Sequence, residues 1–222
     1  MENPFRQNPD FASDPDFRLI ETLGWHPNGI GFRHLDRHLA RLQRSALALG
    51  LAFDGDAVRE VLDTVGGVHA QRCRLTLDGQ GHMDLTTAAL GKTPEDWCLV
   101  VAETRLQSCD PWLRHKTTRR ALYESTRANL PAGVGEAIFV NEREEVCEGT
   151  ITNIFVTLAN ADRVTPPLAC GVLPGILRET LLDSGDFREQ VVTLDDLRTA
   201  RSIAVGNSLR GLIPARFAGG LG

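Results

Sequence analysis

Residues 17–50, FRLIETLGWHPNGIGFRHLDRHLARLQRSALALG, hold the pattern that decides the fold class. The first half predicts two short strands around a turn at residues 26–29, because the Asn-Gly pair there is a strong hairpin signal. The second half predicts a helix, since leucine and alanine recur at helical spacing up to Gly50, which ends the pattern. Two strands that lead directly into a long helix favour a mixed fold.

The rest of the chain continues this mixture of strands and helices without regular alternation. The expected elements are a helix at 54–65 capped by Asp54 or Asp56, a hairpin at 71–90, a strand at 97–104, a helix at 115–130, strands at 136–144 and 145–159, helices at 176–185 and 194–200, and a closing strand pair at 201–217. Such an order indicates an α+β fold rather than a parallel βαβ sheet.

A proline-containing connector divides this pattern into two parts. We predict a small N-terminal α+β sub-domain at residues 1–106, a linker at 107–115 and a larger C-terminal sub-domain at 116–222. The first seventeen residues are rich in Pro, Asp and Asn and predict a loose arm.

Composition narrows the class of protein. The 222 residues are 42% hydrophobic and 24% charged, which indicates a globular chain rather than a disordered one. The net charge of −5 argues against a general binder of nucleic acid or anionic membranes. No apolar run approaches the roughly 18 residues of a spanning helix, and the acidic start does not resemble a secretion signal. We therefore expect a soluble cytoplasmic protein.

The cysteines indicate no metal or disulfide site, whereas the rarity of lysine draws attention to two residues. Five cysteines without C-x-x-C spacing indicate neither a zinc site nor a disulfide framework, so we expect small buried residues, with a catalytic thiol as the less favoured alternative. Of 24 basic residues, only Lys92 and Lys116 are lysine. Arginine cannot act as an amine nucleophile, so a retained lysine can carry chemistry that arginine cannot. Lysines left over from GC-rich coding are the alternative.

Lys116 is the stronger candidate of the two lysines, because it is predicted at the start of a helix. Its neighbours include Arg114, Arg119 and Arg120. A helix N-terminus and nearby cations both lower the pKa of an amine and so favour a nucleophile. The alternative is an ordinary exposed lysine at a helix start.

Glu148 is a carboxylate inside a strand-like, β-branched segment, where a buried charge demands a partner. The adjacent Gly149 suggests a close backbone approach. An edge-strand glutamate is the alternative. The nearby Glu142, Glu144 and Glu145 are interpreted as solvated turn charges.

Three further places are candidates for binding an anion. Residues 173–175, Leu-Pro-Gly, precede a helix that starts near Ile176, and the free N–H groups of such a first turn bind phosphate. Asn207 and Ser208 offer polar groups in a turn after a strand. Arg41 lies between apolar positions of the long helix. For each place the alternative is that it binds nothing.

The order and spacing of five segments resemble one known family. The segments are RHLDRHLARLQRSALALG, HKTTRRALYE, VCEGTITNIF, GVLPGILRETLL and GNSLRGLIPAR. They resemble the class IV, fold-type IV pyridoxal-phosphate enzymes, which include branched-chain and D-amino-acid aminotransferases and 4-amino-4-deoxychorismate lyase. The resemblance covers residues 18–217, and the 32-residue step from Lys116 to Glu148 is similar to the family's own.

The resemblance implies a D-amino-acid-aminotransferase-like fold with a shortened N-terminal sub-domain and a cofactor cleft between the sub-domains. It implies that Lys116 holds pyridoxal 5'-phosphate covalently and shuttles a proton, and that Glu148 pairs with the pyridine nitrogen. The residues expected to bind the cofactor are Arg41, Lys116, Glu148, Ile176, Leu177, Asn207 and Ser208. Arg72 and Arg74, two apart on a predicted strand, are expected to recognise the substrate carboxylate, with a solvated strand face as the alternative.

Three departures from the family pattern leave the substrate open. The strand and hairpin that usually open the family are missing. Ala121 stands where branched-chain aminotransferases carry a tyrosine, and Tyr123 is expected to point elsewhere. Leu177 replaces a hydroxyl residue of some relatives, which leaves only its main-chain N–H.

The reaction that the resemblance favours is transamination between an amino acid, branched-chain ones among the candidates, and a 2-oxo acid, in a homodimer. The rival is the lyase reaction that releases pyruvate from 4-amino-4-deoxychorismate and leaves 4-aminobenzoate. A non-catalytic family member is the least favoured alternative, because Lys116 and Glu148 are both present.

Overall fold

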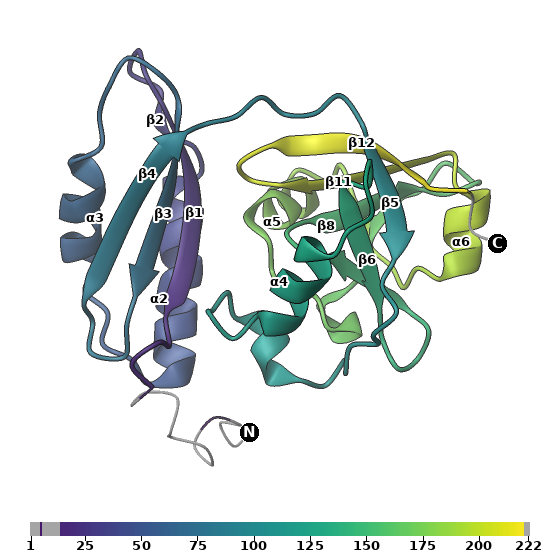
Figure 1. Cartoon of the computed structure of the whole chain (residues 1–222), viewed down its shortest axis with the longest axis horizontal. Helices are drawn as coiled ribbons and strands as arrows, with labels where there is room; N and C mark the ends of the chain where they lie inside the picture. The colour runs from purple at the N-terminus through teal and green to yellow at the C-terminus, as the bar shows by residue number, and fades with distance from the viewer. Residues whose placement is uncertain (1–4, 6–13, 220–222) are drawn as a thin grey trace. The chain divides into compact units, whose positions relative to one another are not determined.

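The computed structural model describes Phe5 and residues 14–219, and the chain falls into two compact units (Figure 1). Unit 1 is formed by Met1–Lys92 and His115–Arg119, and unit 2 by Thr93–Arg114 and Arg120–Gly222. The chain therefore passes from one unit to the other three times. Most of the predicted N-terminal arm lies outside the described residues.

The unit boundaries differ from those expected at residues 106 and 116. β5 (Trp97–Val101) pairs with two strands of unit 2, so it does not belong to the N-terminal part. His115–Arg119 returns to unit 1, because Thr117 forms a β-bridge with Leu19. Strand pairing, rather than the proline-containing connector, decides to which unit each segment belongs.

Among its described residues, unit 1 contains a four-stranded antiparallel sheet and the helices α2 and α3. Its elements are β1 (Leu19–His26), β2 (Gly31–Phe32), α2 (Leu35–Leu49), α3 (Gly55–Asp63), β3 (Gln71–Leu77) and β4 (Met83–Ala89). The strand order is β2-β1-β3-β4. Both hairpins that the sequence predicts, β1-β2 and β3-β4, are present.

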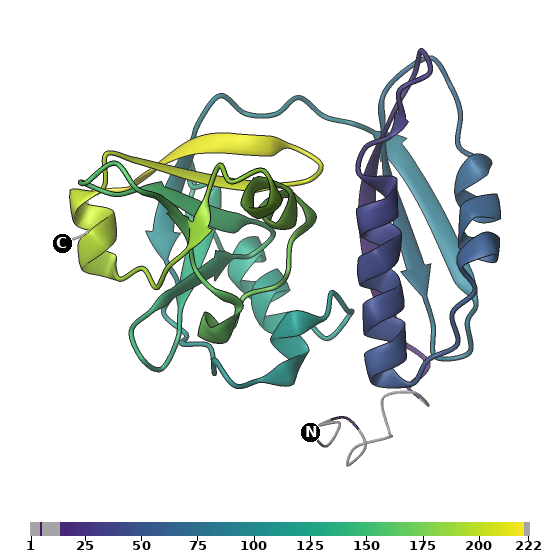
Figure 2. The same ribbon diagram turned by 180° about the vertical axis from the view of Figure 1, so that it is seen from behind.

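Helices α2 and α3 cover one face of the sheet in unit 1 (Figure 2). The register places Glu21 of β1 beside Leu75 of β3, and Leu75 beside Leu85 of β4, so these side chains share a face. Glu21 bonds to Arg41 of α2, and α3 packs on β4. Buried apolar side chains on this face, such as Leu75, pack under α2 and α3 and form the core of the unit.

The helix ends follow local chemistry. α2 ends where Gly50 takes a left-handed conformation with φ of 69°, which glycine adopts without strain. α3 begins at a cap formed by Asp54, whose carboxylate accepts from the N–H groups of Asp56 and Ala57. Asp54, rather than Asp56, is therefore the cap.

Unit 2 is built on a mixed sheet that closes on itself. Its strands are β5, β6 (Glu136–Val140), β7 (Val146–Gly149), β8 (Asn153–Thr157), β9 (Arg163–Thr165), β10 (Arg188–Glu189), β11 (Ser202–Asn207) and β12 (Gly211–Phe217). The order is β10-β9-β8-β11-β12-β5-β6-β7, and β7 pairs again with β8 through Glu148 and Asn153. This extra pairing makes a barrel of six strands, which leaves no free edge between β7 and β8.

Short helices surround this barrel. They are the 3₁₀ turns η1 (Pro111–Arg114) and η2 (Leu168–Cys170) and the α-helices α4 (Ala121–Ala128), α5 (Ile176–Asp183) and α6 (Leu194–Thr199). α5 starts at Ile176 as predicted. The helix predicted over 115–130 is shorter, and the strand predicted over 145–159 is two strands joined by a tight turn at residues 150–152.

Apolar residues fill the barrel and the layer outside it. One cluster comprises Trp97, Leu99, Ile138, Val146, Ile154, Val156, Leu158, Val164, Val192, Leu197, Val205 and Ile213. A second cluster includes Phe139, Cys147 and Val172, with Tyr123 of α4 packed against it. Within the part of the chain that the structure describes, no helix has the length and apolar character that crossing a membrane requires.

Candidate active site

Lys116 lies on an extended segment of unit 1, not at a helix start as the sequence predicts. Its main-chain carbonyl accepts from the N–H of Ile20 over 2.8 Å, and Thr117 forms a β-bridge with Leu19. The main-chain N–H of Thr118 donates to Arg18 over 2.9 Å. The segment therefore extends the sheet beside the start of β1, and α4 begins only at Ala121. The helix-dipole argument for this amine is wrong, since the amine is five residues from that helix.

Arg41 is buried in unit 1 in a bidentate ion pair that the sequence did not predict. Its Nε and Nη2 atoms donate to the two carboxylate oxygens of Glu21 over 2.8 and 2.6 Å. Nδ1 of His38 lies 2.6 Å from Oε2 of the same carboxylate. Burial by itself raises the pKa of Glu21, but Arg41 and His38 outweigh burial and lower it to about 2. Glu21 and His38 therefore fix the orientation of the Arg41 guanidinium.

Arg72 and Arg74 share one face of β3, as their spacing predicts. Arg72 pairs with Gly24 of β1 and Arg74 with Thr22, whereas the intervening Cys73 is buried on the face that α2 covers. Arg72 is exposed and Arg74 is half-buried. Both side chains therefore stand on the face opposite the helices of the unit.

Glu148 is the buried carboxylate of unit 2, with 5% of its surface exposed. Its Oε2 accepts from the main-chain N–H of Leu173 over 3.0 Å and from Nδ2 of Asn153 over 3.3 Å. Its Oε1 accepts from the hydroxyl of Tyr123 over 3.0 Å. Tyr123 therefore points to Glu148, which corrects the expectation that it points elsewhere. Three donors on one buried carboxylate favour its ionised form.

A second buried carboxylate, Glu136, shapes the turn that follows Glu148, and sequence reasoning missed it. Its Oε2 accepts from the hydroxyl of Thr152 over 3.0 Å and from the N–H of Ile151 over 3.2 Å, and its Oε1 accepts from the hydroxyl of Thr150. A Cβ atom on Gly149 would lie only 2.7 Å from Cγ of Glu136, which confirms the close approach expected there. The alternation of Thr150 and Thr152 around the turn is the sequence signal for this partner.

The start of α5 leaves main-chain donors without a side-chain cap. Gly175 holds the cap position, and the N–H groups of Ile176 and Leu177 follow it in the first turn. A Cβ atom on Gly175 would lie 1.9 Å from Oδ1 of Asn153, so only glycine fits against this amide. Asn153 thus contacts both the helix start and Glu148. The arrangement suits an anion at the helix start.

Asn207 and Ser208 lie where β11 turns into β12, but their roles differ. Asn207 is fully used in the fold: its Nδ2 donates to the carbonyl of Ile151 over 3.1 Å, and its Oδ1 accepts from the N–H groups of Leu209 and Arg210. Ser208 makes no side-chain hydrogen bond within the described residues. Asn207 therefore stabilises the turn, and the hydroxyl of Ser208 is the group that can bind a ligand.

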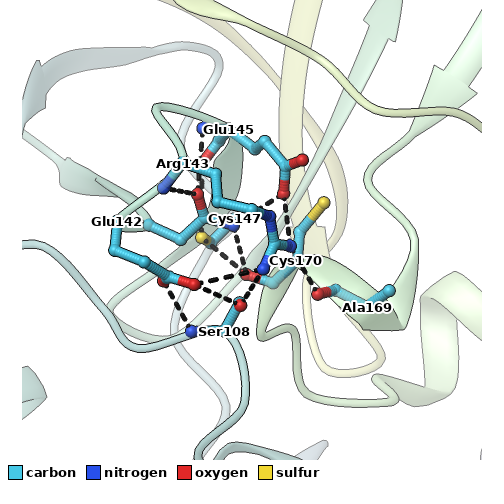
Figure 3. A network of polar contacts seen from close by, with 8 residues as sticks. Ser108, Glu142, Arg143, Glu145, Cys147, Ala169 and Cys170 are labelled. Carbon is cyan, nitrogen blue, oxygen red and sulfur yellow. Dashed lines mark hydrogen bonds and ion pairs between the residues drawn. The ribbon is translucent and has the colours of Figure 1, made fainter.

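A polar network joins the turn between β6 and β7 to Ser108 and to η2 (Figure 3). Nη2 of Arg143 donates to Glu145 over 2.6 Å and to the carbonyl of Ala169 over 2.9 Å. Glu142 accepts from the main-chain N–H and the hydroxyl of Ser108 over 2.8 and 2.6 Å. Glu142 and Glu144 are exposed in the β6–β7 turn, as interpreted from the sequence, and Glu145 is half-buried. Glu142 and Glu145 also tie this turn to the residues before η1 and to η2.

The cysteines match the expected small buried residues in part. Cys73, Cys147 and Cys170 are buried, but Cys109 is exposed. Burial raises the pKa of Cys170 to about 12 and moves the pKa of the Cys147 thiol higher still, which argues against either as a nucleophile. Among the described residues, no group of three or more His, Cys, Asp and Glu side chains is placed to hold a metal ion.

Comparison with known proteins gives consistent matches along the chain. Residues 18–217 match the family model described as amino-transferase class IV. The crystal structure of a proposed amino-acid aminotransferase from Mesorhizobium loti is similar with a TM-score of 0.87 and 45% identity, and covers 91% of this chain and 100% of that chain.

Two curated relatives also match over most of their length. A proposed branched-chain-amino-acid aminotransferase from Methanocaldococcus jannaschii is 32% identical over 216 residues, 84% of this chain and 74% of the relative. A proposed aminodeoxychorismate lyase from Schizosaccharomyces pombe is 25% identical over 186 residues, 79% of this chain and 80% of the relative. The family match includes the segments of both Lys116 and Glu148.

Proposed function

The chain belongs to the class IV aminotransferase family and is an enzyme of that family, and from this premise we propose that it uses pyridoxal 5'-phosphate to transfer an amino group between an amino acid and a 2-oxo acid. Two similar proteins, at 45% and 32% identity, are themselves proposed aminotransferases. Branched-chain amino acids are the first donors to try, because the M. jannaschii relative is named for them.

Glu148 is the residue that carries the proposal. A protonated pyridine nitrogen needs a buried, ionised carboxylate as partner, and Glu148 is buried with three hydrogen-bond donors on its two oxygens. An ionised carboxylate accepts on both oxygens and donates on neither, which matches a set of three donors. The donor set of unit 2 therefore fits a cofactor that carries a positive charge on its ring nitrogen.

Lys116 is the proposed amine. Pyridoxal phosphate supplies an aldehyde for an amine and an electron-withdrawing ring that stabilises negative charge at the substrate Cα. Lys116 would hold the cofactor through its Nζ atom when no substrate is present. Once released, the same Nζ atom takes the proton from the substrate Cα, which is the role of a positioned general base. Pairing of its main chain with β1 fixes where the side chain starts.

The phosphate of the cofactor needs cationic and N–H donors. We assign these to the main-chain N–H groups of Ile176 and Leu177, the hydroxyl of Ser208 and the guanidinium of Arg41. The start of α5 has no side-chain cap, so it fits an anion: the positive end of the helix dipole and the main-chain N–H groups both favour negative charge there. Asn207 contributes by holding the turn on which Ser208 lies.

The substrate carboxylate is assigned to Arg72 and Arg74. Their two guanidinium groups stand on one face of β3, and arginine binds carboxylates in a bidentate manner. Replacing each arginine by lysine should raise the KM for the amino acid while leaving cofactor binding unchanged. An unchanged KM in both variants would mean that Arg72 and Arg74 face solvent and do not bind the substrate.

Cleavage of 4-amino-4-deoxychorismate is the second candidate, because the S. pombe relative is a proposed aminodeoxychorismate lyase. Both reactions need an amine such as Lys116 to remove the Cα proton and a carboxylate such as Glu148 on the ring nitrogen. They differ in where the next proton goes. In transamination Lys116 would deliver that proton back to complete amino transfer, whereas the lyase reaction would end in loss of pyruvate.

A visible absorbance scan of the cofactor-loaded protein during one turnover separates the two candidates. The protein is mixed in turn with L- and D-amino acids and with 4-amino-4-deoxychorismate. If an amino acid bleaches the yellow colour and a 2-oxo acid restores it, the protein is an aminotransferase and the panel identifies the donor. If only aminodeoxychorismate reacts, pyruvate appears and the colour returns unaided, the protein is the lyase. A protein that never becomes yellow with added cofactor would overturn both.

The assembly proposed with this function is a homodimer. The family resemblance supports it, and sedimentation equilibrium of the loaded protein tests it directly. A mass of one chain over the whole concentration range would contradict it.

A further inference from the structure

Tyr123 is one of the three donors to Glu148, and the chemistry assigned above gives its phenol no role of its own. The phenol oxygen of Tyr123 lies 3.0 Å from Oε1 of Glu148. The ring of Tyr123 packs against Phe139 with centroids 4.9 Å apart, and the guanidinium of Arg120 lies 5.7 Å from its centroid. The tyrosine is thus held by contacts on its ring and by a hydrogen bond at its tip.

The two oxygens of Glu148 have different partners. Oε2 accepts from Asn153 and from the main-chain N–H of Leu173. Oε1 accepts the hydroxyl of Tyr123. The amide and the main chain would remain if Tyr123 were changed, so the phenol can be removed without touching the other two bonds.

The charges around this contact keep the phenol a donor. Burial and then the negative charge of Glu148 raise the pKa of Tyr123 far above its ordinary value, so the phenol keeps its proton. The same negative charge raises the pKa of Arg114, although burial outweighs it and lowers that pKa. Arg120, over the ring, favours the ionised phenol but is outweighed by burial and Glu148.

We propose that Tyr123 is a positioning residue that holds Oε1 of Glu148 and so sets how firmly the carboxylate keeps a proton on the cofactor's pyridine nitrogen. This inference rests on the proposed function, because it needs Glu148 to face that nitrogen. A hydrogen bond to an ionised carboxylate favours the charged form. Without the phenol donor the carboxylate becomes more basic, the shared proton moves toward Glu148, and the ring withdraws electrons less strongly.

The first test needs neither cofactor nor turnover. Tyr123 is the only tyrosine of the chain, so labelling tyrosine with 13C at Cζ gives a single NMR signal for this phenol. In the apoprotein the signal should stay at its un-ionised position to high pH, and in Glu148→Gln it should titrate at lower pH, because the neighbouring charge is gone. If the tyrosine signal titrates at the same pH in the wild type and in Glu148→Gln, the contact is overturned. Both proteins keep Tyr123, so the test does not depend on a tyrosine variant.

The second test follows the pyridine nitrogen in the loaded protein. With 15N-labelled cofactor, the chemical shift should indicate a protonated nitrogen in the wild type and move toward the neutral value in Tyr123→Phe. Ser125→Ala, on the same helix with an exposed hydroxyl, is the matched control and should keep the wild-type shift. A merely structural tyrosine would not move this shift, so a wild-type shift in Tyr123→Phe overturns the proposal.

The third test is the rate of the first half-reaction. Loss of a hydrogen bond to a charged group should slow it roughly tenfold in Tyr123→Phe, with half-saturation by the amino acid within about twofold because no substrate contact is lost. An unchanged rate overturns the inference. If the wild type turns over no donor, the proposed function fails, and the two NMR tests still decide the role of Tyr123.

Discussion

Glu136 and Thr152 face each other across the β7–β8 turn, with the hydroxyl of Thr152 donating to Oε2 of Glu136 over 3.0 Å. Thr150 donates to the other oxygen from the opposite side of the turn. The turn between Glu148 and Asn153 is therefore wrapped around a carboxylate that is itself fully buried. The geometry of Glu148 depends on this carboxylate, because the turn starts directly after Gly149.

Glu136→Ala should destabilise the protein by about 3 kcal/mol, because it leaves two buried hydroxyls and a main-chain N–H without their acceptor. Urea unfolding followed by circular dichroism measures the loss. Glu103→Ala, an exposed carboxylate of the same unit, should stay within about 0.5 kcal/mol of the wild type. Equal effects of the two changes would mean that the turn does not need its carboxylate.

Gly149→Ala tests the same turn by adding a single methyl group. The new Cβ atom would lie 2.5 Å from Oγ1 of Thr152 and 2.7 Å from Cγ of Glu136. Forcing these apart should cost roughly 2 kcal/mol of unfolding free energy. Gly91→Ala is the matched control, since nothing lies within 4 Å of the position of its Cβ. Similar melting temperatures for both variants would contradict the crowding.

The elements predicted from sequence are those that local chemistry decides. The stripe of α2, its end at Gly50 and the start of α5 at Ile176 all follow from side-chain spacing and turn residues within one segment. The same is true of the β3-β4 hairpin. These signals need no knowledge of distant partners, so the sequence is sufficient.

The segment around Lys116 shows why other parts could not be predicted. Residues 115–130 have helical spacing, yet Thr117 and Thr118 pair with the chain near the start of β1, about a hundred positions earlier. β-branched residues adopt a strand readily when such a partner is present. The bond between Tyr123 and Glu148 is non-local in the same way, since it joins a helix to a strand of the barrel. No local pattern indicates either contact.

Acid should weaken the protein through Glu21. Its pKa is lowered from 4.5 to about 2 by Arg41 and His38 against the effect of burial. A lowered pKa stabilises the folded state above pH 4.5, and that stability is lost as pH falls toward 2. The shift corresponds to about 3 kcal/mol. We therefore expect the free energy of unfolding, measured in urea at successive pH values, to fall less steeply with acid in Glu21→Gln than in the wild type. Identical pH dependence in the two proteins would contradict the ion pair.

Arg41→Lys should weaken binding of pyridoxal phosphate about tenfold or more, because lysine cannot form a bidentate pair with Glu21 and still present a planar fork to a phosphate. Binding of pyridoxal, which lacks the phosphate, should change much less. Quenching of tryptophan fluorescence measures both affinities. Arg59→Lys, which alters only an exposed pair with Asp36, is the control. An equal loss of affinity for pyridoxal phosphate and for pyridoxal would contradict the assignment of Arg41 to the phosphate.

Lys116→Ala should abolish turnover and leave the melting temperature within a few degrees of the wild type, because its amine is a reagent and its main chain keeps the pairing with β1. Lys92→Ala should keep full activity. Since these are the only two lysines, borohydride reduction of the loaded wild type followed by peptide mass analysis should place the cofactor on the Lys116 peptide alone. Cofactor found on Lys92, or a fully active Lys116→Ala protein, would refute the assignment of the amine.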